Sequence, residues 1–428
     1  MDSERAEDVA ARPTSAEPGE WRARLWTFLA AQSISSAGSQ VTAVALPVIA
    51  VFLLHAGPVA ASALYASAYL PGALLGPFVG ALIDRWPLRP VLVGCDIIRA
   101  AVLTAIPIAS ASGHLSLALL FTVAAVVGLF SVGFDSAAAA YIPLVVPESS
   151  YGSANSLSSI SSSVGQLAGP SVGGFLIQAA GASRALLVDA ASYLCSAALL
   201  FGGSPHKPPA PAGRLSAGGL ISDAADGYRY VRSDPVLPGL IVGTAVLNLG
   251  GSAIGSLFAI YAYRDIGLSV GQYGTTLSVF SAGALLGGIG FPRLHKHIRL
   301  TRICLLASAA TAAALFLIPL AQLGAGFLLL LAYQVSFALA ATIWAIAGAT
   351  LRQLRTPQVM LGRVSALNRT ISVGALPLGA GLAAVLSSVF GVSTSILVTC
   401  ILAALAPLVY ARRSFRTAAD SLSGGRIA

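Results

Sequence analysis

The chain has 428 residues, of which 56% are hydrophobic and only 10% are charged, and its formal net charge is +9. Soluble domains carry roughly 25% charged residues, so this composition excludes a water-soluble globular protein and indicates that the bilayer is the solvent. A positive net charge is compatible with nucleic-acid binding, but the places where the basic residues fall argue against such a partner.

Apolar stretches recur along the whole chain, and a stretch of about 20 residues is long enough to cross a bilayer as an α-helix. The mixed acids, bases and prolines before the first stretch predict a disordered tail rather than a signal peptide. We therefore expect an all-α membrane protein with twelve transmembrane helices, at residues 25–54, 60–83, 91–111, 115–141, 153–180, 182–202, 235–263, 270–290, 301–320, 324–350, 363–390 and 393–411.

The second half of the chain repeats features of the first. The residues GALLG at 72–76 recur at 283–287, and Ile-Ser at 160–161 recurs at 371–372, both at an offset of 211 residues. Parallel repeats are typical of transporters that rock around a site near the membrane midplane. Duplication of a structural unit without transport would leave the same repeat.

A Pro- and Gly-rich segment that cannot continue a span separates the two halves. The expected organisation is two parallel-repeat six-helix bundles joined by a linker. In chain order the segments are a disordered cytoplasmic tail (1–20), an N-terminal bundle (21–202), a cytoplasmic linker (203–234), a C-terminal bundle (235–411) and a cytoplasmic tail (412–428).

The basic residues are distributed unevenly between the loops. Of the 25 Lys and Arg residues, 21 lie in the two tails, the linker and alternate loops. Positive charge stays on the cytoplasmic side of a membrane protein. We therefore expect a multi-pass protein of the cell membrane with both termini in the cytoplasm. Topology accounts for the basic charge, so no nucleic-acid partner is expected.

Polar side chains at four-residue intervals in the first and seventh spans predict a water-filled cavity, because hydrocarbon offers them no hydrogen-bond partner. The alternative is that these side chains join neighbouring helices by hydrogen bonds. Tyr65 and Tyr69, one turn apart, either add aromatic surface to a substrate path or pack in the core. The candidate cavity residues are Gln32, Ser36, Gln40, Thr244, Asn248 and Ser252.

The loop after the second predicted span carries charges between two apolar stretches. It resembles the signature loop of the major facilitator superfamily at Gly80, Asp84, Arg85 and Arg89. It departs from that loop at Pro87 and Leu88. The resemblance implies the twelve-helix transporter fold, with Asp84 holding the halves together near the start of the eleventh span. His295 replaces this acid in the second half, which predicts a weaker contact there. The charges alone would also serve to fix topology.

The fifth predicted span contains a glycine and proline pattern. It resembles the antiporter motif of the superfamily's drug and metabolite exporters at Gly165, Gly169, Pro170, Gly173 and Gly174. An ordinary interface between helices, packed through small residues, would have the same glycine spacing and is the alternative. Shorter pieces at 96–100, 188–194 and 361–370 are similar to the branch that contains siderophore and macrolide exporters.

Four of the charged residues inside predicted spans form a candidate ion network. Asp96, Arg99 and Asp135 lie at a similar depth, where they compensate one another in either a gating network or a structural salt bridge. Asp189 has no basic residue on its own helix face, since Arg184 is five positions away. A buried carboxyl group of this kind is a candidate proton carrier, with Asp135 the next candidate. The alternative is a packing role, with hydrogen bonds to Ser192 and Ser196 or a cation from another helix.

These features predict a secondary transporter that exports a small amphipathic or hydrophobic compound, such as an antibiotic, a siderophore or a related metabolite, by proton antiport. An importer or symporter on the same fold is the alternative. No histidine lies in a span beside Ser, Cys or Asp, and no Gly-x4-Gly-Lys-Ser/Thr sequence occurs. An enzyme or an ATP-driven pump is therefore not expected. We expect no cofactor or metal, and a monomer whose partners are its substrate, protons and lipid.

Overall fold

The computed structural model describes residues 18–83, 86–147, 157–158, 172–201 and 217–411. These residues are helical almost throughout, and no β-strand occurs among them. Residues 157–158 and 172–180 are also helical. The named helices are α1 (Pro18–Val48), η1 (Ile49–Leu53), α2 (Pro58–Ile83), α3 (Leu88–Ala111), α4 (Leu117–Val145), α6 (Ala182–Phe201), α7 (Ala217–Ser233), α8 (Leu237–Ile260), η3 (Tyr261–Asp265), α9 (Val270–His297), α10 (Leu300–Leu315), α11 (Leu317–Leu320), η4 (Ala321–Leu323), α12 (Gly326–Arg355), α13 (Gln358–Phe390), α14 (Val392–Ala403) and α15 (Ala406–Ala411).

Eleven of the described helical stretches are long and apolar enough to cross a membrane. They coincide with eleven of the twelve predicted spans, and most of the predicted span 153–180 lies outside the described residues. The prediction of an all-α, multi-pass membrane protein is confirmed. Helix α9 continues to His297, beyond the predicted end near 290, because basic residues at a helix end reach past the apolar part of the bilayer.

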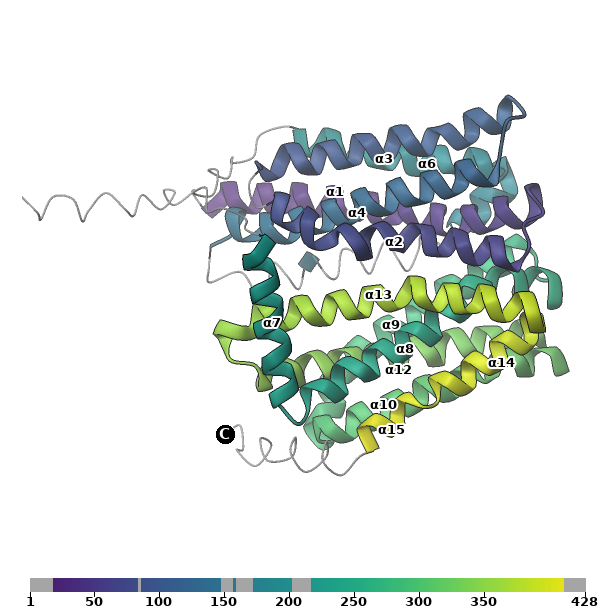
Figure 1. Ribbon diagram of the computed structural model, residues 1–428. Helices are drawn as coiled ribbons and strands as arrows, with labels where there is room; N and C mark the ends of the chain where they lie inside the picture. The colour runs from purple at the N-terminus through teal and green to yellow at the C-terminus, as the bar shows by residue number, and fades with distance from the viewer. Residues whose placement is uncertain (1–17, 84–85, 148–156, 159–171, 202–216, 412–428) are drawn as a thin grey trace, which may run out of the picture.

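The helices form two groups (Figure 1). We call α1, α2, α3, α4 and α6, with η1, the N-group, and α8 to α15, with η3 and η4, the C-group. The groups meet where α2 packs along α13 and α8. Helix α7 lies across the ends of the helices, and we call that end of the molecule the α7 end (Figure 1). The opposite end, at the loops 54–57 and 266–269, is called the distal end.

The two groups repeat two details of backbone structure. The first span of each group ends in a π-helical turn, Ile49–Leu53 in one and Tyr261–Asp265 in the other. Gly181 and Gly391 each connect two helices through a single residue with positive φ, 86° and 78°. Residues with a Cβ rarely adopt such a φ, so glycine is required at both connections. The repeat seen in the sequence therefore extends to local conformation.

Helix α7 is fixed to the C-group by polar contacts. The Arg355 side chain pairs with Asp234 (3.1 Å). The Tyr230 hydroxyl donates to the backbone carbonyl of Arg355 (2.9 Å), one of the carbonyls left free at the end of α12. Arg363 of α13 pairs with Asp226 (3.3 Å). These contacts hold the described part of the linker against the end of the C-group.

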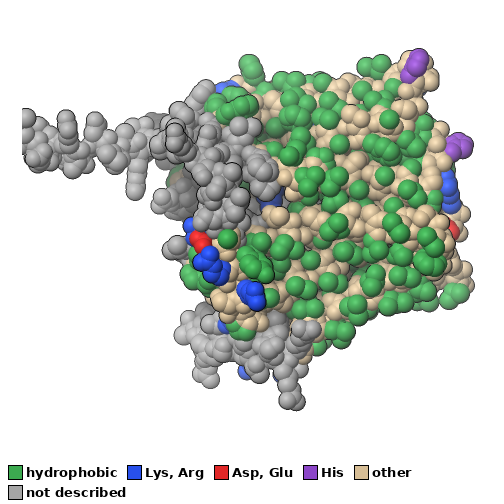
Figure 2. Space-filling view, in the orientation of Figure 1, with side chains coloured by type: hydrophobic (Ala, Val, Ile, Leu, Met, Phe, Trp, Pro, Cys, Tyr) green, Lys and Arg blue, Asp and Glu red, His purple; other side chains and the backbone are tan. Residues whose placement is uncertain are grey.

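The sides of the molecule are apolar. Figure 2 shows hydrophobic side chains spread over the lateral face of both groups, whereas the blue and red atoms gather toward its two ends. Large side chains such as Phe175, Leu378 and Val389 are about two-thirds exposed. Exposed apolar surface of this extent marks contact with lipid rather than water.

Candidate functional site

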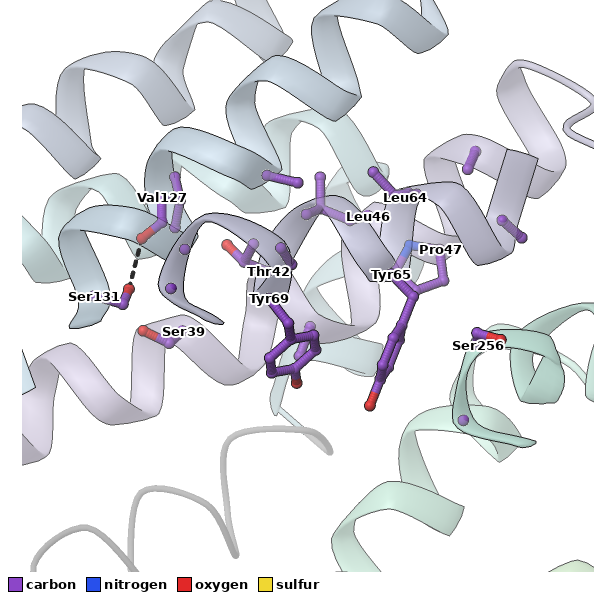
Figure 3. Close-up of a pocket in the computed structure, with 18 of the residues that line it drawn as sticks. Ser39, Thr42, Leu46, Pro47, Leu64, Tyr65, Tyr69, Val127, Ser131 and Ser256 are labelled. Atoms are coloured by element: carbon purple, nitrogen blue, oxygen red, sulfur yellow. Dashed lines mark hydrogen bonds between the residues drawn. The ribbon is translucent and has the colours of Figure 1, made fainter. Parts of the chain in front are cut away.

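A cavity of about 400 Å³ lies where the two groups meet. Its wall comes from α1, η1, α2 and α4 of the N-group and from α8 and α13 of the C-group. Most of the lining residues are Ala, Leu, Val, Pro and Gly (Figure 3). Concave, mostly apolar sites with a few polar groups are typical of ligand-binding pockets. The polar lining residues are Ser39, Thr42, Tyr65, Tyr69, Ser131, Asp135 and Ser256.

Two tyrosines of α2 form an aromatic part of the wall. The rings of Tyr65 and Tyr69 lie 4.9 Å apart between centroids and project from α2 side by side (Figure 3). Tyr65 reaches the C-group, since a Cβ built on Gly255 of α8 would lie 3.4 Å from its hydroxyl oxygen. The wall therefore offers flat, polarisable surface with a hydroxyl at its edge.

Asp135 is the charged side chain of this wall among the described residues. It is exposed, and both Arg99 of α3 and Arg369 of α13 are close enough to interact with it electrostatically. Arg369 is also exposed, one turn along α13 from the lining residue Val373. An acid of the N-group and a base of the C-group therefore face the same region.

Behind the wall lies a buried ion pair. Arg99 pairs with Asp96 one turn earlier on α3, and both side chains are almost fully buried. The guanidinium carbon lies 4.3 Å from the Tyr193 ring centroid and 4.6 Å from that of Phe134. Among the described residues Asp96 Oδ2 and Arg99 Nε have no hydrogen-bond partner. Pairing and ring contacts offset the cost of holding these charges inside the membrane.

Asp189 of α6 is completely buried. Its carboxylate accepts a hydrogen bond from Thr42 Oγ1 of α1 and another from Ser192 Oγ (3.1 Å). Gly38 of α1 allows this contact, because a Cβ there would lie 2.7 Å from Asp189 Oδ1. The Ser196 hydroxyl, by contrast, has no hydrogen-bond partner within the described part of the chain.

Three hydroxyls of the cavity wall connect it to these buried groups. Thr42 donates to Asp189, as just described. Ser39 Oγ lies 2.9 Å from Tyr193 Oη, and Arg99 donates to Ser131 Oγ (3.4 Å). We call Asp96, Arg99, Asp189, Ser192 and Tyr193 the polar cluster. A change of charge in the polar cluster is therefore one hydrogen bond away from the cavity.

The six residues predicted to line a cavity are not among its lining residues. Gln32 Oε1 accepts from Ser158 (2.8 Å), and Asn248 Nδ2 donates to the backbone carbonyl of Ser372 of α13 (3.0 Å). Thr244 and Ser252 donate to carbonyls of their own helix. Ser36 and Gln40 share the helix face of Gln32. The contacts of Gln32 and Asn248 join helices, which is the alternative that the sequence left open, whereas those of Thr244 and Ser252 stay within their own helix.

The loop motif is only partly described, because Asp84 and Arg85 lie outside the described residues. Gly80 lies near the end of α2. Arg89 Nε donates to the carbonyl of Leu200 (2.6 Å), which satisfies a free carbonyl at the end of α6. In the second half, the His295 ring stacks on Phe291 with 5.8 Å between centroids.

The antiporter-like motif is also partly described, since Gly165, Gly169 and Pro170 lie outside the described residues. A Cβ on Gly173 would lie 3.0 Å from the Cα of Val41 in α1. A Cβ on Gly174 would lie 3.4 Å from the Cα of Gly274 in α9. Glycine therefore lets this segment approach both groups closely.

The groups also touch at the distal end. The rings of Phe52 and Tyr263 lie 4.8 Å apart between centroids. Arg264 donates to the backbone carbonyl of Ala56 (3.0 Å), and Ser62 Oγ lies 3.2 Å from Ser256 Oγ. These contacts join the groups between the cavity and the distal loops. No group of His, Cys, Asp and Glu among the described residues is arranged to hold a metal ion.

Two groups of membrane-spanning helices around a central cavity define a membrane transporter of small molecules. Residues 28–373 match the sequence profile of the Major Facilitator Superfamily, and the chain belongs to this family. The resemblance inferred from the loop and glycine motifs is thereby confirmed.

Relatives in sequence include uncharacterised transporters and efflux proteins. An uncharacterised MFS-type transporter of Bacillus subtilis, YfiS, is 31% identical over 310 residues, which cover 71% of this chain and 70% of the relative. The multidrug efflux pump Tap of Mycolicibacterium fortuitum is 27% identical, over 88% of this chain and 92% of its own. Macrolide efflux protein A of Streptococcus pyogenes is 21% identical, over 87% of this chain and 91% of its own.

The fold is also that of solved transporters. A bacterial homologue of the human lysosomal transporter Spinster, in an inward-facing and unoccupied conformation, superposes with a TM-score of 0.73. The identity is 18%, and the alignment covers 94% of this chain and 99% of that chain. At this identity the likeness establishes the major facilitator fold.

Proposed function

We propose that this transporter exports small amphipathic or hydrophobic compounds from the cytoplasm in exchange for protons, by alternating access in the cell membrane. The observation that carries the proposal is the bond from Thr42, in the cavity wall, to the buried carboxylate of Asp189. A proton-coupled exporter needs a substrate site and a group that binds and releases protons, close enough to influence each other. The two lie one hydrogen bond apart here.

The composition of the cavity wall supports the substrate class. Alanine, leucine and valine side chains and the two tyrosines suit a hydrophobic or aromatic body, and Asp135 suits a basic group on it. Antibiotics and metabolites of amphipathic character combine these features. That Tap and macrolide efflux protein A are efflux proteins supports export rather than uptake.

The charge distribution supports the direction. The α7 end carries the clusters at Arg229 and Arg232, at 293–302 and at 352–363, which we assign to the cytoplasm. The distal contacts then lie toward the outside, and they oppose access to the cavity from there. This is the arrangement expected of an inward-facing transporter that binds its substrate from the cytoplasm.

Inverted membrane vesicles carrying the protein test substrate, direction and coupling in one assay. A panel of macrolides, siderophores and cationic dyes is added outside the vesicles, whose interior is acidified and holds a pH dye. We expect at least one compound to accumulate only while the pH gradient exists, with protons leaving the vesicles as it enters. A proton ionophore serves as the control and should abolish accumulation.

Two results would overturn the proposal. Accumulation in right-side-out vesicles alone would make the protein an importer. Accumulation that persists with the ionophore present, and without movement of protons, would remove proton coupling.

A further inference from the structure

Thr42 differs from the other cavity hydroxyls in its partner. Its Oγ1 donates to Asp189 Oδ2, whereas Ser39 contacts the Tyr193 hydroxyl and Ser131 accepts from Arg99. Of the two acids of the polar cluster, Asp189 is the one without an ion pair among the described residues, since Arg99 pairs with Asp96. Thr42 therefore lines the cavity as a residue, and its hydroxyl contacts a titratable acid.

Building on the proposed function, we infer that Thr42 is a positioning residue that makes the binding of an N–H-bearing substrate and the protonation of Asp189 mutually unfavourable. A threonine hydroxyl has one hydrogen and two lone pairs. With Asp189 ionised, the hydrogen goes to the carboxylate, which polarises Oγ1 and strengthens it as an acceptor toward the cavity. The preferred ligand is then one that donates a hydrogen bond from a protonated amine.

Protonation of Asp189 reverses this arrangement. The carboxyl group now carries its own hydrogen and donates it to Oγ1, so that one lone pair of Oγ1 is used and its hydrogen is released from Asp189. The hydroxyl becomes a poorer acceptor, and a substrate N–H loses its partner on the wall. A proton and a donor-bearing substrate thus compete through one hydroxyl, which is the thermodynamic requirement for antiport.

The groups that face Asp189 do not account for the pH dependence of ligand binding, which we assign to Asp189 itself. Helix α3 contributes Asp96 and Arg99, which neutralise each other, and α6 itself contributes Tyr193. Helix α1 contributes hydroxyls, Ser39 and Thr42, among its described residues. Asp189 lies closer to the cavity hydroxyls, through Thr42, than the other acid of the polar cluster.

A pair of ligands separates this hydrogen-bond effect from simple charge attraction. We suggest a fluorescent dansyl-alkyl tertiary amine, protonated at both test values, and its N-methyl quaternary analogue, which has the same charge but no N–H. Loss of the Asp189 charge weakens both ligands equally. Only the amine also loses its hydrogen bond. Between about pH 8 and about pH 6 the amine should lose roughly threefold to tenfold more affinity than its analogue.

Substitutions of purified protein assign the effect to Thr42. Thr42→Val, which removes the hydroxyl, should abolish the difference between the two ligands, and Thr42→Ser should keep it. Thr27→Val is the matched control, because Thr27 is an exposed threonine of the same helix that donates to the carbonyl of Ala23. Binding of the quaternary analogue reports whether each variant is folded, and Thr42→Ala replaces Thr42→Val if that variant is not.

The inference fails if a hydroxyl-free variant retains the difference between the amine and its analogue, or if the wild-type protein shows none. Failure of the proposed function is a separate result. Vesicles that transport without moving protons would overturn the exchange of substrate for protons, while the binding measurement still decides whether Thr42 links ligand and acid.

Discussion

Phe52 and Tyr263 occupy equivalent positions in the repeated halves, 211 residues apart, and their rings meet at 4.8 Å between centroids. Each belongs to the π-helical turn that ends the first span of its group. Such turns are frequent at functional sites. Because the two turns are equivalent and touch each other at the distal end, we expect the N-group and the C-group to separate there when the distal end opens.

Phe52→Ala should favour opening at the distal end. An aromatic pair contributes about 0.5–1.5 kcal/mol, so its loss should raise the open population roughly twofold to tenfold. A cysteine at Ser62, a fully buried position one turn into α2, reports the opening through its rate of labelling from outside. Phe175→Ala, at an exposed phenylalanine, is the control and should leave the rate unchanged. An unchanged rate in Phe52→Ala would show that the ring pair does not close this end.

Gly38→Ala should destabilise the protein, because α1 and α6 are too close there for a side chain. The new Cβ would lie 2.0 Å from Ser192 Oγ and 2.7 Å from Asp189 Oδ1. Overpacking of this kind costs about 1–3 kcal/mol. Gly94→Ala is the matched control, since nothing lies within 4 Å of that Cβ, and helix propensity favours alanine by up to ~1 kcal/mol. In thermal unfolding measured in detergent, Gly38→Ala should show a lower midpoint temperature than the unsubstituted protein, and Gly94→Ala should not. Equal midpoints would contradict the close contact.

The spans were predictable from sequence, but the face of α1 that lines the cavity was not. Hydropathy locates spans because each must cover the same apolar thickness. On α1, Gln32, Ser36 and Gln40 give a polar stripe as regular as that of Ser39 and Thr42. Which stripe meets the cavity depends on where neighbouring helices pack, and Gln32 bonds to Ser158, 126 residues away.

The contact of Asp189 with Thr42 could not be predicted from the sequence either. The depth of Asp189 in its predicted span marked it as a candidate. Its hydrogen bond to Ser192 of the same helix is one of the contacts that the alternative, a packing role, had named. Thr42 lies 147 residues earlier in the chain. A threonine in an apolar helix carries no sign of such a contact, because threonine also bonds to its own backbone, as Thr244 does.

Asp135→Asn should weaken cationic ligands and spare neutral ones. Asp135 is exposed in the cavity, where water screens it, so a charge at about 4 Å contributes about 1 kcal/mol, or roughly fivefold in affinity. Equilibrium binding of a cationic dye and a neutral analogue of the same shape measures this. Asp265→Asn, at an exposed acid of the distal end, is the control and should change neither affinity. Equal loss for both ligands would assign Asp135 a structural role.

The α7 end should face the cytoplasm. In a variant without the four native cysteines, a cysteine at Ser233, the last residue of α7, should react with a membrane-impermeant maleimide only in inverted vesicles. A cysteine at Gly57, in a distal loop with nothing within 4 Å of its Cβ, should react only in intact cells. Disrupted membranes, where both should react, are the control. The reverse pattern would invert the topology and with it the proposed direction.

Asp189→Asn should uncouple transport from protons without stopping it. Asparagine keeps the size of the side chain and an oxygen that accepts from Thr42 or Ser192, but it cannot bind and release a proton. Uphill accumulation driven by a pH gradient should therefore fall at least about tenfold. Exchange of labelled for unlabelled substrate at equal pH should persist, because exchange needs the conformational cycle without net proton release.

Asp96→Asn is the comparison that separates coupling from structure. Asp96 is as deeply buried, but it neutralises Arg99, and its loss leaves that cation unpaired at a cost of about 2.5–3.5 kcal/mol on insertion scales. We expect this variant to lose stability and exchange together. An Asp189→Asn protein that still accumulates substrate uphill would exclude Asp189 as the proton carrier. One that behaves like Asp96→Asn, losing exchange with stability, would leave it a structural role in the contact between α1 and α6.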